Sequence, residues 1–184
     1  PTIGRLPLEL GGARFADGTT RVVQTATGMG KVHLPPAVDP ETKQTVAYQV
    51  IASRGMEYET SRQFLNPQGG LQSRFEARLA KVVDTKGWIS ADFHVHGPNS
   101  VDTGLGENER VLSYAAEGVE LMTSTDHDQL TDYRPAIYHL GLERWLKSMV
   151  GLEVSPLDFG HFLGFPMPFD ENQELNNAFH WRVP

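Results

Sequence analysis

The chain has no cysteine among its 184 residues. It therefore forms no disulfide bond and cannot hold zinc through thiolates. This absence leaves the location in the cell open, because an exported protein and a cytoplasmic one both fit it. No uninterrupted apolar run reaches the roughly 18 residues that a membrane-spanning helix needs, so we expect no membrane span.

Basic side chains are also few. Lys and Arg number 16 against 23 Asp and Glu, which gives a formal charge of −7 and a pI near 5.4. They form no dense cluster, whereas nucleic-acid-binding proteins usually present a basic face, so we expect no nucleic-acid partner. The apolar fraction of 39% and the aromatic fraction of 9% are typical of a folded protein.

The first part of the chain, residues 1–86, has the pattern of a β-rich domain. Two segments rich in β-branched residues, 20–27 and 47–53, predict strands. Residues 71–79 alternate between small or apolar side chains and long polar ones, which is typical of a half-buried antiparallel strand. No helical pattern of similar strength occurs before residue 100, and we predict a small sandwich-like domain.

The second part, residues 87–184, changes to alternating strands and helices. We predict, in chain order, a strand at 89–93, a helix at 107–118, a strand at 119–124, a helix at 133–147, a strand at 149–154 and a short strand at 161–165. This order indicates an α/β domain. In such domains the functional side chains usually follow the carboxyl ends of the strands.

Side chains that bind metals lie at or just after these predicted strands. They are His94, His96, Asp102, His127, Glu153 and His161. Imidazole and carboxylate groups suit zinc, manganese and iron alike. Residues i and i+2 of a strand leave the same face, so His94 and His96 are placed to hold one ion. Glu153 follows an apolar strand, where an unpaired carboxylate is costly to bury. The sequence therefore predicts a hydrolytic metal centre.

Each of these signals also has a plain structural reading. A single His-x-His pair is weak, Asp102 suits a turn, and His161 alone suits a buried core histidine. We expect Asp92 to point the same way as the two histidines and to orient an imidazole. Asp126 would fix the tautomer of His127 or handle a proton, which makes it the candidate catalytic residue.

Taken together, these segments resemble a known family of metallohydrolases. The segments are Asp92-Phe-His-Val-His with Ser100 and Asp102, Thr125-Asp-His127, Gly151-Leu-Glu153 and Gly160-His-Phe-Leu-Gly164. They are similar to the first motifs of the polymerase and histidinol phosphatase (PHP) family, and nearest to its carbaryl-hydrolase-like branch (CehA/McbA type). The resemblance covers roughly residues 45–170.

The resemblance implies a distorted (β/α)7 barrel, of which residues 87–184 supply the first part, and a centre of two or three divalent ions (Zn, Mn or Fe). It implies that His94 and His96 hold the first ion and that Glu153 bridges it to a second ion held by His161. Asp102 and His127 help to hold a third. The implied reaction is hydrolysis of a small phosphoester, or of a carboxyl or carbamate ester, by a metal-activated water.

The later motifs of that family, a further histidine and an Asp-x-His pair, have no counterpart in this sequence. We therefore expect the chain to be a piece of a longer protein that carries the front part of the site. The alternative function is a non-catalytic module that binds carbohydrate or a protein partner and keeps a vestigial metal site. The sequence carries no mark of the oligomeric state.

Overall fold

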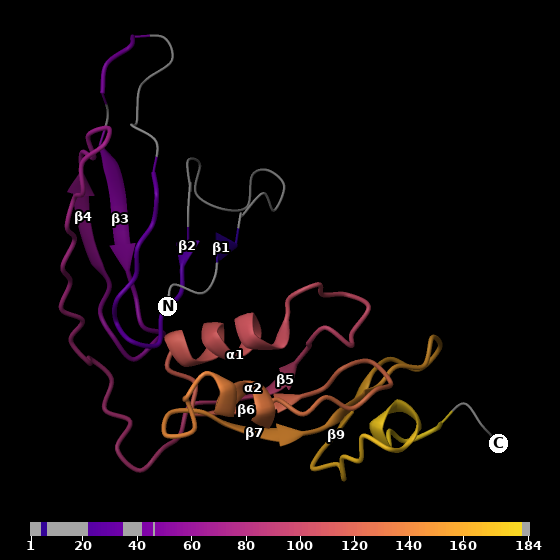
Figure 1. The fold of residues 1–184 in the computed structure, drawn as a ribbon. Helices are drawn as coiled ribbons and strands as arrows, with labels where there is room; N and C mark the ends of the chain where they lie inside the picture. Colours follow the sequence, from indigo (N-terminus) through magenta and orange to yellow (C-terminus); the bar gives the residue numbers. More distant parts are fainter. Residues whose placement is uncertain (1–4, 7–21, 35–41, 46, 182–184) are drawn as a thin grey trace. The chain divides into compact units, whose positions relative to one another are not determined.

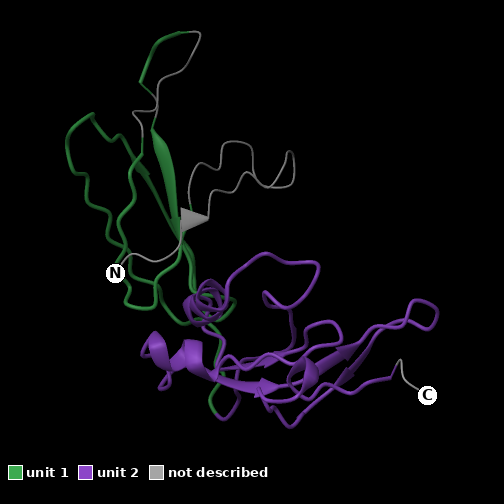
Figure 2. Ribbon diagram, turned by 45° about the vertical axis from the view of Figure 1, so that its right-hand side comes forward, with its two compact units in different colours: residues 1–86 green, residues 87–184 purple. Residues whose placement is uncertain are grey.

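The computed structural model describes residues 5–6, 22–34, 42–45 and 47–181. The chain divides into two compact units, unit 1 (residues 1–86) and unit 2 (residues 87–184), which Figure 2 shows in different colours. The division lies where the sequence pattern changes. The described part is mixed α/β, with small sheets and few helices.

Unit 1 contains two small antiparallel sheets in its described part. The strands are β1 (Arg5–Leu6) with β2 (Val22–Val23), and β3 (Tyr48–Ala52) with β4 (Ser61–Leu65). The prediction of a strand at 47–53 is confirmed by β3. Of the strand predicted at 20–27 the structure has β2 alone, and residues 20 and 21 lie outside the described residues. The predicted sandwich stays a prediction.

The strand predicted at 71–79 is wrong. This segment forms no ladder, although Phe75 and Leu79 are half-buried while their neighbours are exposed. Its contacts with the rest of unit 1 include a hydrogen bond from the Gln63 side chain to the carbonyl of Glu76, at 2.8 Å. Alternation reports which side chains are buried, but a strand also needs a partner backbone in register. The chain forms that ladder between β3 and β4 instead.

Unit 2 is built on a parallel sheet with the strand order β5-β6-β7. Its elements are β5 (Ala91–Val95), α1 (Glu107–Ala116), β6 (Leu121–Ser124), α2 (Arg134–His139) and β7 (Lys147–Val150). Successive right-handed crossovers in one direction place their helices on one face of a sheet, and both helices lie on the same face in Figure 1. Beyond this sheet, β8 (Leu152–Val154) pairs antiparallel with β9 (Phe162–Gly164), and a 3-10 helix covers Glu174–Asn176.

The first predicted helix forms as expected, and the second is shorter than predicted. Acidic Glu107 and Glu109 stand in the first turn of α1, where they complement the helix dipole. Helix α2 ends at His139 rather than near 147, because Gly141 turns the chain with a φ of +67°. Leu146 is nevertheless fully buried, so the apolar spacing over this region reflects burial of two consecutive segments, not one helix.

The strand predicted at 149–154 is divided at Gly151. A side chain there would lie 2.8 Å from the carbonyl oxygen of Ser124 and 3.0 Å from that of Gly164. Glycine therefore lets β7 end against β6 and lets β8 begin its pairing with β9. This division directs the side chain of Glu153, in the middle of β8, toward the ends of β5 and β6.

The largest apolar core of unit 2 lies between the helices and the parallel sheet. Its buried members are Val95, Val111, Met122, Tyr133, Ala136, Ile137, Leu142 and Leu146. Val95 is the last residue of β5 and Met122 lies in β6, so the core fixes the two strands whose ends carry the predicted ligands. No helix in the described ranges is long and apolar enough to cross a membrane.

Candidate metal centre

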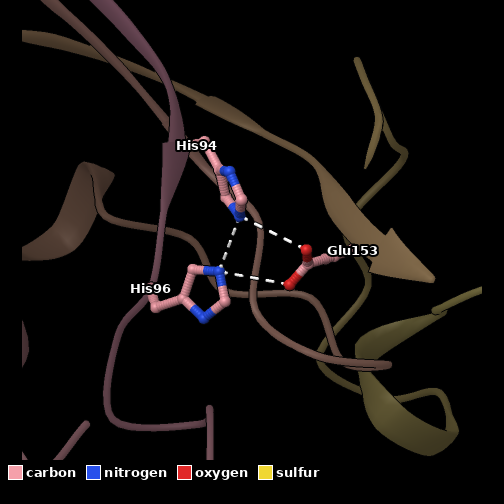
Figure 3. Close-up of side chains that lie close together, drawn as sticks. All are labelled: His94, His96 and Glu153. Atoms are coloured by element: carbon pink, nitrogen blue, oxygen red, sulfur yellow. Dashed lines mark hydrogen bonds and ion pairs between the residues drawn. The ribbon is translucent and has the colours of Figure 1, made fainter. Parts of the chain in front are cut away.

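The first two predicted ligands leave the end of β5. The register of β5 shifts between Asp92 and Val95, so that Val95 enters the apolar core. The imidazoles of His94 and His96 both point toward Glu153, with their Nε2 atoms 2.9 Å apart (Figure 3). The His94 side chain is half exposed, at 52%, whereas that of His96 is 16% exposed.

Glu153 is the residue on which the site converges. Its side chain is only 3% exposed. Its oxygens lie close to four imidazole nitrogens: Oε1 is 3.3 Å from His94 Nε2 and 3.0 Å from His161 Nδ1, and Oε2 is 3.2 Å from His96 Nε2 and 2.9 Å from His127 Nδ1. The antiparallel pairing of β8 with β9 brings His161, which directly precedes β9, next to Glu153. A buried carboxylate requires such partners, because leaving its charge uncompensated costs several kcal/mol or more.

One oxygen of Glu153 is close to nitrogen atoms without being hydrogen-bonded to them. Oε2 is buried and has no hydrogen-bond partner among the described residues, although His96 and His127 lie within ion-pair distance. A cation bound by Glu153 together with either of these imidazoles would satisfy this oxygen. The donor set therefore suits a metal ion better than a network of hydrogen bonds.

Asp102 lies on the side of His96 and His127 that faces away from Glu153; these two are the less exposed, inner histidines of the site. Its Oδ1 is 3.1 Å from His96 Nδ1, and its Oδ2 is 3.5 Å from His127 Nε2. Partial burial acts to raise the pKa of Asp102, but the hydrogen bond and charge of His96 and the Ser100 hydroxyl outweigh it and hold that pKa below its usual value. The Asp102 carboxylate is therefore ionised near neutral pH and able to bind a cation or to orient both imidazoles.

The six residues form three overlapping groups that could hold an ion. They are His94, His96 and Glu153; His96, Asp102 and His127; and His127, Glu153 and His161. Two atoms that bind one zinc ion at about 2.0–2.1 Å are separated by about 2.9–3.4 Å for angles between about 90° and 109°. In the first group the Nε2 atoms of His94 and His96 are 2.9 Å apart, and they lie 3.3 Å from Oε1 and 3.2 Å from Oε2 of Glu153, so both carboxylate oxygens face the same space. The residues therefore fit the ion.

Not all three groups can bind an ion at the same time. The first and third groups share only Glu153, so one carboxylate can bridge two ions there. The second group uses the nitrogens of His96 and His127 that face away from Glu153. A neutral imidazole offers one lone pair, so either ring serves one group at a time. The described residues thus supply three ligands each for two ions.

Two sequence expectations concern aspartates near these ligands. Asp92 does not contact either imidazole: it accepts hydrogen bonds from the backbone N–H of His94 and from the hydroxyl of Tyr114 in α1, both at 2.9 Å. The register shift in β5 breaks the alternation on which the expectation rested. Burial and this bond to Asp92 raise the pKa of Tyr114 to about 12.

Asp126 is fully buried beside the ligands rather than among them. Its Oδ1 accepts the backbone N–H of Gly97 at 2.5 Å, and its Oδ2 accepts the hydroxyl of Thr131. It belongs to none of the three groups that could hold an ion.

Several residues that shape the centre carry no sequence signal of their own. Ser155 Oγ is 2.6 Å from His127 Nδ1, and Thr131 bonds Asp126. Gly97 gives room to Tyr133, whose hydroxyl a Cβ at that position would overlap. Serine, threonine and glycine are common in loops, so only the folded chain distinguishes these positions from others of the same type.

Comparison with known proteins adds no relative to this picture. No family model, no curated protein and no solved structure matches the chain. The function of the chain is therefore inferred from the residues and the geometry of the site.

Proposed function

We propose that the chain carries ligands of a metal-dependent hydrolase centre of the PHP type, which acts on a small phosphoester or on a carboxyl or carbamate ester. The observation that supports this proposal most is Glu153, a buried carboxylate within 3.3 Å of nitrogen atoms from four histidines. Hydrophobic or hydrogen-bonded cores rarely gather so many imidazoles around one carboxylate.

The roles of the residues follow from their positions. His94 and His96 would hold one divalent ion, His127 and His161 would hold a second, and Glu153 would be a ligand available to both. Such ions, when bound, supply Lewis acidity that activates a water molecule and polarises the ester oxygen. The outer ligands His94 and His161 are half exposed, at 52% and 50%, so a substrate reaches the centre from their side. The less exposed ligands, His96 and His127, lie deeper together with Glu153 and fix the geometry of the site.

Metal content of the chain purified without chelator tests the proposal. We expect about one to two equivalents of Zn, Mn or Fe in the wild type, none in Glu153→Ala, which removes the shared ligand, and a reduced content in His94→Ala. His139→Ala is the matched control, because His139 is an exposed histidine at the end of α2 and should leave the metal content unchanged. Equal metal content in all four proteins would contradict the proposal.

The reaction is tested with two chromogenic substrates, an aryl phosphate and an aryl ester, on metal-loaded protein. Turnover of either one that disappears in Glu153→Ala supports a hydrolase and tells the two ester classes apart. A metal-loaded chain that hydrolyses neither substrate would disprove the enzymatic function.

A further inference from the structure

Asp126 joins the ends of the two strands that deliver the inner ligands. It directly precedes His127, and the backbone N–H that it binds belongs to Gly97, which directly follows His96. Its other oxygen accepts the hydroxyl of Thr131, which in turn accepts a hydrogen bond from Asn99 at 2.9 Å. The carboxylate therefore ties the loop after β5 to the segment after β6.

Ser100 makes a second link between the same two ends. Its side-chain oxygen accepts the backbone N–H of His127 at 3.2 Å and lies 2.9 Å from His96 Nδ1. Ser100 is 5% exposed, so these bonds are made out of contact with water. Asp126 reaches from β6 to the β5 loop, and Ser100 reaches back from the β5 loop to His127.

The surroundings of Asp126 do not suit proton transfer. The residue has 0% exposure, and both of its oxygens already accept hydrogen bonds. A group that takes a proton from water or substrate must come within hydrogen-bond distance of it, directly or through one water. Burial on all sides leaves no such approach to Asp126, whereas it suits a residue that fixes its neighbours.

We propose that Asp126 is a positioning residue which, together with Ser100, fixes the spacing between His96 and His127. This inference rests on the proposed metal centre. The two imidazoles lie edge to face with ring centroids 4.6 Å apart, and both face Glu153. Loss of either link loosens the two segments that follow β5 and β6, so His96 and His127 are held less firmly at the distances that an ion requires.

The test compares Asp126→Ala with Asp126→Asn. Asparagine keeps an oxygen for the Gly97 N–H and can donate its amide to Thr131, so we expect a dissociation constant for Co²⁺ or Zn²⁺ within about 10-fold of the wild type. Alanine removes both bonds, and we expect binding to weaken by about 10- to 100-fold, as for other residues that orient metal ligands. Ser100→Ala should weaken binding in the same direction. Asp158→Ala, at an exposed aspartate of unit 2, serves as the control.

Amide hydrogen exchange on the metal-free protein gives a second, independent readout. We expect slow exchange at Gly97 in the wild type and in Asp126→Asn, and fast exchange in Asp126→Ala. Wild-type metal affinity in Asp126→Ala, or a Gly97 amide that exchanges freely in the wild type, would overturn the inference. A wild-type chain that takes up no metal would instead contradict the proposed function, while the exchange measurement would still decide whether Asp126 holds the two ends together.

Discussion

The two units of the chain differ in how many of their apolar side chains are buried. Among residues 22–34, 42–45 and 47–181, every buried apolar side chain belongs to unit 2, and none of those in unit 1 is buried. In β3 and β4, Ile51 and Phe64 are 53% and 71% exposed. A site whose ligands must meet within a few tenths of an ångström needs rigid packing around it. The difference shows why all six candidate ligands stand in unit 2.

The largest difference in stability effect between the two units should come from shortening a side chain of the core. Leu146 is fully buried between the helices and the sheet, and we expect Leu146→Ala to lower the free energy of unfolding by about 2–5 kcal/mol. The matched change in unit 1, Ile51→Ala, should cost less than about 1 kcal/mol because that side chain is already half in water. Urea unfolding followed by circular dichroism measures both. Equal losses would show that unit 1 has a core of comparable strength.

A smaller effect should come from the position that joins the core to the site. A methyl group at Gly97 would overlap the hydroxyl of Tyr133, and we expect Gly97→Ala to destabilise the chain by about 1–3 kcal/mol. The Tyr133 hydroxyl is buried without a hydrogen-bond partner in the described structure, so Tyr133→Phe alone should be nearly neutral. The double variant should recover part of the loss, which a double-mutant cycle of unfolding free energies measures. Strictly additive effects would show that the two residues do not meet.

The smallest effects should be opposite in sign in the two units. Burial and the charges of Asp126 and Asp132 raise the pKa of Glu107 in unit 2. The ionised side chain of Glu107 therefore destabilises the fold above its unfolded pKa of about 4.3. The free energy of unfolding falls as pH rises from that value through the higher pKa of the folded state. We expect Glu107→Gln to be more stable than the wild type near pH 7, by less than about 1 kcal/mol since the residue is partly exposed. The difference should vanish in acid.

Glu57 of unit 1 gives the contrasting case. Its hydrogen bond with Lys81 lowers the pKa of Glu57. The stabilisation is present above the unfolded pKa and is lost as pH falls through the lower, folded value. Glu57→Gln should therefore melt slightly below the wild type near neutral pH and converge with it in acid. Thermal unfolding across this pH range checks both carboxylates, and shifts of the same sign would contradict the assignment.

The candidate site was more predictable than the fold around it. His94 and His96 lie at the end of one predicted strand, and Glu153 and His161 lie in two others, so the predicted strand pattern alone indicates that they converge. The extent of α2 could not be predicted in the same way, since buried Leu146 keeps a helical spacing beyond the turn at Gly141. Strand β4 was missed because its sequence, Ser-Arg-Gln-Phe-Leu, has little β-branched character.

The residue types along the chain were enough to predict six candidate imidazole and carboxylate ligands at or near strands, the absence of thiolate ligands, and a change of pattern near residue 87. Local residue types suffice for this prediction, because the type of each candidate ligand and the periodicity of the apolar residues can be read directly from the sequence. Which nitrogen of His96 and of His127 faces Glu153, and which faces Asp102, is known from the folded chain alone. The folded chain also shows that Asp126 turns inward to Gly97 and Thr131. Both depend on contacts between segments that are distant in the chain, such as that of Gly97 with Asp126, 29 residues apart, and no spacing within one segment encodes them.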